Sequence, residues 1–152
     1  INSLETLELY MNSITGTLPT ELGNLKNLKK LSLYNNEITG EIPMSIYTMN
    51  SLEELILSSN KLSGKLSFEV ANLTSLKNLS LFENNFEGQV PLDLENLNQL
   101  SEMNISYNKF SGLVTKKLAK LDTLNMTMLD ANGEEIVMTI APETNERIAS
   151  EE

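Results

Sequence analysis

The residues best suited to acid–base or metal chemistry are carboxylates. Paired carboxylates are the catalytic groups of glycosidases, and sets of oxygen ligands suit Ca²⁺. The candidates are Glu8, Glu53, Glu54 and Glu102. Lysines interleave with them at Lys29, Lys30 and Lys77, which favours solvated charges on a surface over a catalytic or calcium site. The chain has no EF-hand spacing, phosphate-binding loop or nucleotide fingerprint.

The chain lacks the two residue types on which most catalytic sites depend. It contains no His and no Cys. It therefore cannot form thiolate or imidazole metal sites, a Cys nucleophile or a His base. We expect no catalytic residue, no metal site and no cofactor, and hence no enzyme.

Charge and hydropathy narrow the class of partner. The net charge is −10, and residues 122–152 carry eight acids against one base, Arg147. An acidic end and a nearly balanced body argue against nucleic acid or an anionic membrane as partner. No run of 18 apolar residues is present, so we expect no membrane span.

The elements that position these residues follow from an internal repeat of 24 residues. Leucine recurs at this interval without insertion, at Leu4, Leu28, Leu52, Leu76, Leu100 and Leu124. Apolar residues also occupy the third and fifth positions after each leucine of the first five units. Asparagine occupies the eighth position, at Asn12, Asn36, Asn60, Asn84 and Asn108. Five of the seven glycines fall in one later column, and three of the four prolines fall in another.

Each column has a physical cause. Alternating leucines predict one short, half-buried strand per unit. A single unit cannot bury its apolar side alone, so the units must stack into a parallel sheet, which forms the concave wall. The asparagine side chain can bond the backbone groups that the following turn leaves without partners, which makes a ladder along the stack. Two further apolar columns spaced by three residues predict 3₁₀ or α-helical turns on the convex side.

These columns resemble the plant-type leucine-rich repeat, whose pattern is Leu-x-x-Leu-x-Leu-x-x-Asn-x-Leu-x-Gly-x-Ile-Pro. The matches at residues 16–19, 40–43 and 88–91 are close, whereas Ser67 and Thr115 replace the proline. The resemblance implies an α/β repeat fold: a right-handed solenoid with a parallel concave sheet, short convex helical segments and a second, short sheet. Members occur in receptor ectodomains, polygalacturonase-inhibiting proteins and surface proteins of bacteria. Because plant ectodomains usually carry cysteine-paired caps, their absence favours a secreted or surface protein of a bacterium.

The two ends depart from the repeat. We expect five full repeats over residues 1–123, a capping β-hairpin over 124–141 and an acidic tail over 142–152. Residues 130–133, Asp-Ala-Asn-Gly, are a turn signal, and residues 135–140 are a strand candidate. The last repeat strand should pair antiparallel with that strand and close the core. At the other end Ile1 looks like the remainder of a preceding unit, so we expect either truncation or coverage by another chain.

The residues between the core leucines form surface columns that map a candidate site on the concave face. Large rings are enriched at binding hot spots, although rings in line can also serve only to stabilise a sheet. The predicted partner-binding residues are Tyr10, Tyr34, Ile56, Phe82 and Tyr107, with Glu8, Lys30, Glu54 and Glu102 among them.

Two hypotheses for function follow from the sequence. The first is non-enzymatic recognition of a protein or peptide, or else a carbohydrate, through the concave face. The alternative is a structural or assembly element that self-associates through its exposed N-terminal repeat face. Family resemblance favours an extracellular or cell-surface location.

Overall fold

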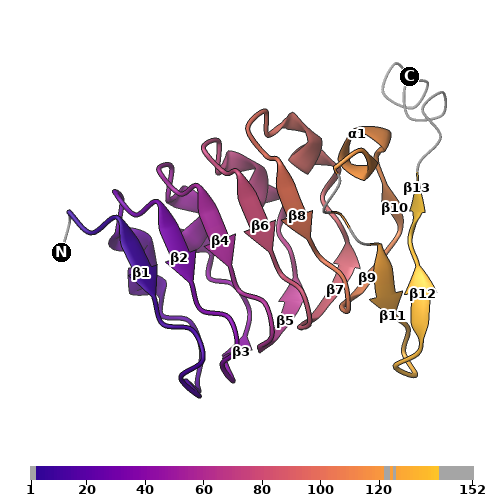
Figure 1. Ribbon diagram of the computed structural model, residues 1–152, viewed down its shortest axis with the longest axis horizontal. Coiled ribbons are helices and arrows are strands. Elements are labelled where there is room, and N and C mark those ends of the chain that lie inside the picture. Colours follow the sequence, from indigo (N-terminus) through magenta and orange to yellow (C-terminus); the bar gives the residue numbers. More distant parts are fainter. Residues whose placement is uncertain (1–2, 122–123, 125, 141–152) are drawn as a thin grey trace.

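Residues that lie 24 positions apart in the sequence pair with each other in a parallel sheet. The computed structural model describes residues 3–121, 124 and 126–140, and shows a solenoid of stacked coils (Figure 1). Leu7, Leu31, Leu55, Leu79 and Met103 lie side by side in successive strands. The strands are β1 (Thr6–Glu8), β2 (Lys30–Ser32), β4 (Glu54–Ile56), β6 (Asn78–Ser80) and β8 (Glu102–Asn104). We number the coils 1–5 from their first leucines, Leu4, Leu28, Leu52, Leu76 and Leu100.

A second parallel sheet and a row of short helices complete each coil. The second sheet contains β3 (Thr39–Gly40), β5 (Lys61–Lys65), β7 (Asn85–Gln89) and β9 (Lys109–Ser111). The convex row contains the 3₁₀ helices η1 (Thr20–Asn24), η2 (Met44–Thr48), η3 (Phe68–Asn72) and η4 (Leu92–Asn96), followed by α1 (Lys116–Ala119). Gly40 ends β3 and Gly64 lies within β5, both at φ +82°, and a side chain at either position would collide with the preceding coil.

The inward residues of all coils form one apolar core. Leu31, Leu55 and Leu57 are fully buried, and the rings of Phe86 and Phe110 stack between coils with centroids 6.0 Å apart. Tyr47 on η2 is also buried, and desolvation raises the pKa of its phenol to about 12. The alternation of leucines therefore sorts side chains into a dry interior and a wet concave face, as the sequence predicts.

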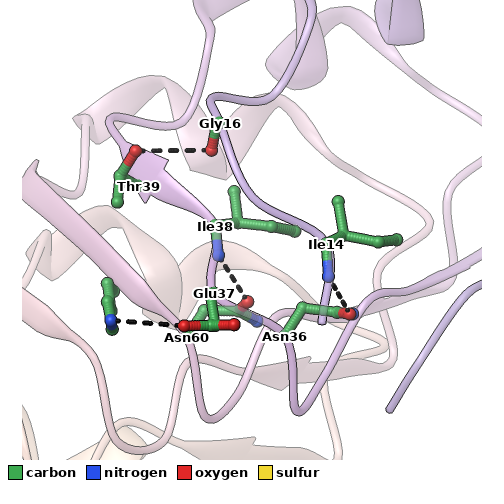
Figure 2. Close-up of polar contacts among 8 residues, drawn as sticks. Ile14, Gly16, Asn36, Glu37, Ile38, Thr39 and Asn60 are labelled. Carbon is green, nitrogen blue, oxygen red and sulfur yellow. Dashed lines mark hydrogen bonds and ion pairs between the residues drawn. The ribbon is translucent and has the colours of Figure 1, made fainter. Parts of the chain in front are cut away.

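The asparagine column forms hydrogen bonds between coils from coil 2 onward. Asn60 accepts the backbone N–H of Ile38 at 3.1 Å and donates to the carbonyls of Leu33 and Leu57, at 2.9 and 3.2 Å. Asn36 accepts the N–H of Ile14 in the same way (Figure 2). Asn84 and Asn108 repeat the pattern. Each rung thus satisfies backbone groups of its own coil and of the coil before it.

Asn12 differs from the other four members of the predicted ladder. Among the described residues its amide donates only within coil 1, to the carbonyl of Tyr10, and its side chain is exposed. The physical reason is position: among the described residues no earlier coil offers it backbone partners. Its own backbone N–H instead donates to the side chain of Asn36.

The C-terminal end is closed by the predicted hairpin, with a different second half. β11 (Thr127–Leu129) pairs antiparallel with β12 (Glu135–Val137). Asp130 accepts the N–H groups of Asn132 and Glu134 and so fixes the turn. The prediction of antiparallel pairing through residue 140 is wrong, because β13 (Thr139–Ile140) pairs parallel with β10 (Leu113–Val114) in the preceding coil.

This crossover gives the cap its core contacts. Met138 lies between β12 and β13, is 7% exposed, and donates its N–H to the carbonyl of Met126. Met128 on β11 is fully buried. The segment that joins coil 5 to the cap is also shorter than in the other coils. The N–H of Tyr107 donates to the carbonyl of Thr127, whereas the spacing of the equivalent bonds in earlier coils would place the acceptor at residue 130. The predicted tail, residues 142–152, lies outside the described residues.

Replacing a buried rung should cost far more than replacing the terminal one. Asn60→Ala removes the side-chain partners of several buried backbone groups, so we expect a loss of roughly 2–4 kcal/mol in the free energy of unfolding. Asn12→Ala should cost less than about 1 kcal/mol, because water can satisfy an exposed group. Urea denaturation of both variants measures the difference. Equal losses would show that the column does not hold the coils together.

The cap should depend on Met138 and not on its neighbour. Met138→Ala removes a buried side chain from the end of the core and should lower the free energy of unfolding by about 2–4 kcal/mol. Val137→Ala, at a side chain that is 70% exposed, should change it by less than about 0.5 kcal/mol. Thermal melts followed by circular dichroism test the pair. A harmless Met138→Ala change would mean that the hairpin does not close the core.

Candidate binding face

The five strands of the main sheet place two columns of side chains on the concave face. Parallel pairing brings Glu54, Asn78 and Glu102 into one row and Ile56, Ser80 and Asn104 into the next. Glu8 and Lys30 continue these rows in coils 1 and 2. Five of the nine residues predicted for partner binding, Glu8, Lys30, Glu54, Ile56 and Glu102, therefore lie on the strands themselves.

The rings occupy the segment just after each strand and form two pairs rather than one line. Tyr10 and Tyr34 stack with centroids 4.6 Å apart and planes 7° apart. Phe82 and Tyr107 meet edge to face, with centroids 5.6 Å apart and planes at 88°. Ser58 takes the ring position in coil 3, so the pairs are separated by one coil.

Tyr107 joins its pair from a different column. It stands one residue after the equivalent of Phe82, in a left-handed conformation with φ 55°. Its hydroxyl donates to Glu135 Oε1 at 2.8 Å, and this hydrogen bond to a carboxylate raises the pKa of Tyr107. Glu135 belongs to β12, so the capping hairpin supplies part of this face. The repeat gave no signal for Glu135, because it lies outside the periodic units.

The lysines near the face are used in ion pairs with neighbouring glutamates. Lys30 contacts Glu8 at 3.8 Å and Lys77 contacts Glu53 at 3.2 Å. Glu53 is therefore engaged by a lysine. Among residues 3–121, 124 and 126–140, no group of three or more His, Cys, Asp or Glu side chains could hold a metal ion.

A hollow of about 310 Å³ opens in the C-terminal half of the concave face. Its lining comes from β4, β6 and β8 and consists of Ile56, Asn78, Ser80, Glu102, Met103 and Asn104. Asn104 is held in place because its side-chain oxygen accepts both the N–H and the hydroxyl of Ser106. Two of the lining residues were predicted for the site. Asn78, Ser80 and Asn104 were missed, although their columns could have identified them.

The N-terminal end exposes a second, more apolar hollow of about 160 Å³. It is lined by coil 1 and coil 2 residues that include Leu7, Leu9, Ile14 and Leu18. Leu9 is 41% exposed, whereas its equivalents Leu33 and Leu57 are 4% and 0% exposed. The N-terminal face of coil 1 is thus not covered by any described residue, although its other side packs against the core.

The described part of the chain contains no helix with the length and hydropathy needed to cross a membrane.

Comparison with known proteins places this geometry in a family. A family model for a leucine-rich repeat region matches residues 2–143. No curated protein gave a significant match.

Solved structures give close matches to the fold. The ectodomain of the Arabidopsis thaliana receptor kinase GASSHO1/SCHENGEN3, in complex with Casparian strip integrity factor 2, is 33% identical over 74% of this chain, with a TM-score of 0.72. A chain of the Arabidopsis BIR3–SERK2 complex is 26% identical over 90%, with a TM-score of 0.75. The Arabidopsis HAESA ectodomain, in complex with a peptide hormone ligand, is 25% identical over 89%, with a TM-score of 0.68.

These receptors are mostly much longer than the chain. It spans 14% of the GASSHO1/SCHENGEN3 chain, 28% of the HAESA chain and 73% of the matched BIR3–SERK2 chain. The repeat columns, the paired sheets and the family match agree over nearly the whole described length. The chain belongs to the leucine-rich-repeat family, in its plant-type form.

Proposed function

We propose that this solenoid is a non-enzymatic module that binds a protein or peptide across its concave face. The observation that carries the proposal is the arrangement of two ring pairs around a polar strand surface with a hollow of about 310 Å³. Rings offer large contact areas with few rotatable bonds, and the asparagines and serines between them offer hydrogen bonds. This combination suits an extended segment that lies along the array.

Rigidity strengthens the proposal. The rings stand on segments whose backbone is bonded to the next coil, as where Met11 donates to Tyr34 and Glu83 donates to Ser106. A surface that is already ordered loses little conformational entropy when a ligand binds. The strands therefore act as a preformed platform.

The similar structures support a protein or peptide as the class of ligand. The HAESA ectodomain is described with a peptide hormone ligand, and BIR3 and SERK2 are described in complex with each other. We extend this class of partner to the present chain, together with an extracellular or cell-surface location. A carbohydrate is the second class of ligand that such rings and amides can bind.

A structural or assembly role remains the second candidate, and one observation favours it. The apolar hollow at coil 1 leaves Leu9 exposed at the end of the stack. Another repeat coil placed there would continue both the sheet and the core. Loss of self-association in a Leu9→Ser variant would identify this end as the contact.

The ring pairs should carry a large part of the binding free energy. In a Tyr34→Ala/Phe82→Ala double variant we expect affinity for the partner to fall at least about tenfold, or about 1.4 kcal/mol. Leu113→Ala, an exposed apolar change away from the rings, is the matched control. The partner is first captured from a source extract with the intact chain and identified by mass spectrometry, and binding is then measured by calorimetry. A folded double variant with full affinity would remove the rings from the site.

The contact between the cap and Tyr107 can be tested without a ligand. The Glu135 carboxylate accepts a hydrogen bond from the Tyr107 hydroxyl and raises the pKa of Tyr107, so Glu135→Ala should lower that pKa toward its ordinary value. Tyrosine absorbance near 295 nm, followed from pH 8 to 12 with Tyr107→Phe as reference, measures the shift. An unchanged titration would mean that Glu135 does not hold the ring.

A further inference from the structure

The convex side carries a row of exposed apolar residues that the proposed function does not use. The first residue of each convex helix occupies the same position in every coil, and successive helices contact one another. These residues are Thr20, Met44, Phe68, Leu92 and Lys116. Met44, Phe68 and Leu92 are 51%, 68% and 40% exposed. We call these five residues the convex stripe.

The three apolar members lie in consecutive coils, with Phe68 in the middle. Single exposed apolar side chains are ordinary on protein surfaces, whereas contiguous ones mark contact sites. The stripe faces away from the core, which other columns fill. Phe68 is the most exposed phenylalanine, although phenylalanine is normally a core residue, as Phe86 and Phe110 are here.

Charges beside the stripe change sign from one end to the other. The second residue of each helix is Glu21, Ser45, Glu69, Asp93 and Lys117 in turn. Coil 1 therefore presents an acid at this position and coil 5 presents a base. Within residues 3–121, 124 and 126–140, neither Glu21 nor Lys117 forms an ion pair, and Glu21 accepts a hydrogen bond from the Thr20 hydroxyl. Lys26 follows η1 and donates to Thr48.

We propose that the convex stripe is an interface for a second copy of this chain, arranged antiparallel about a two-fold axis at Phe68. Such an axis reverses the order of the coils, so coil 1 of one copy faces coil 5 of the other. Met44 then packs against the partner's Leu92, and Glu21 faces the partner's Lys117. The two Phe68 side chains meet at the axis.

Charge complementarity selects a second copy over an unrelated partner. The acid and the base stand at equal distances from Phe68, two coils on either side, as a two-fold contact requires. One contact is unfavourable: Glu69, next to Phe68, faces the partner's Glu69 across the axis. With only three apolar side chains at its centre the interface is small, so the dimer is weak, with a Kd on the order of 100 µM.

The self-association is measured by sedimentation velocity from about 5 to 500 µM at about 0.15 M salt, where the net charge of the copies is screened. Phe68→Ser should raise the Kd about tenfold. Val137→Ser is the matched control, because Val137 is 70% exposed but lies on the cap. Glu69→Gln should tighten the dimer, since it removes the like-charge contact at the axis.

A charge reversal tests the antiparallel arrangement. Glu21→Lys and Lys117→Glu should each weaken association several-fold, and the double variant should restore it, because the reversed pair faces across the axis again. Both positions are exposed, and circular dichroism checks that each variant folds.

Three results would overturn the proposal. They are a chain that stays monomeric throughout the concentration range, a dimer that is insensitive to Phe68→Ser but lost in Leu9→Ser, and a double reversal that fails to restore association. Because the stripe lies on the opposite side from the ring pairs, loss of the dimer would leave binding at the concave face unchanged, so each proposal can fail alone.

Discussion

The structure depends on one constraint: each coil must leave its polar backbone groups and its apolar side where the next coil can satisfy them. A coil of one short strand and one short helix has neither enough hydrogen bonds nor enough core by itself. The unbroken 24-residue period puts Leu31, Leu55 and Leu79 in one register, and it sets Asn36, Asn60 and Asn84 against the carbonyls of the preceding coil. The same spacing therefore aligns both sets of contacts in coils 2–4.

Most of the fold could be predicted because periodicity repeats each signal five times. The strands, the convex helices, the second sheet and the buried leucines all follow from columns in the sequence or from the family that they resemble. The end of the array could not be predicted equally well. Thr127 accepts the hydrogen bond that the period assigns to residue 130, and Thr139 pairs with Leu113 in a separate two-stranded sheet. Such contacts occur once, so no repeated pattern in the sequence predicts them.

In the candidate site, too, the repeated features could be predicted and the contacts that occur once could not. Glu54, Ile56 and Glu102 are on the strand face because strand alternation places them there. The pairing of rings depends on side-chain direction, which alternation alone does not give. Tyr107 was expected to lie in line with Tyr34, yet it reaches Phe82 from the neighbouring column and contacts Glu135 on the cap. The sequence thus predicts which residues lie on the strand face better than it predicts how the rings beside them pair.

The left-handed column at the edge of the concave face explains how that detail is held. Five equivalent non-glycine residues, Met11, Asn35, Ser59, Glu83 and Tyr107, have φ between 55° and 59°. This conformation costs roughly 1–2 kcal/mol per residue. Each of the five donates its N–H to a carbonyl of the next coil, at 2.7 to 3.1 Å, so stacking compensates the strain. At Tyr107 the ring lies beside Phe82, with its hydroxyl bonded to Glu135. Tyr107 can therefore keep its ring beside Phe82 only while β11 is in place to accept its N–H, which makes the cap a condition of the recognition surface as well as of the core.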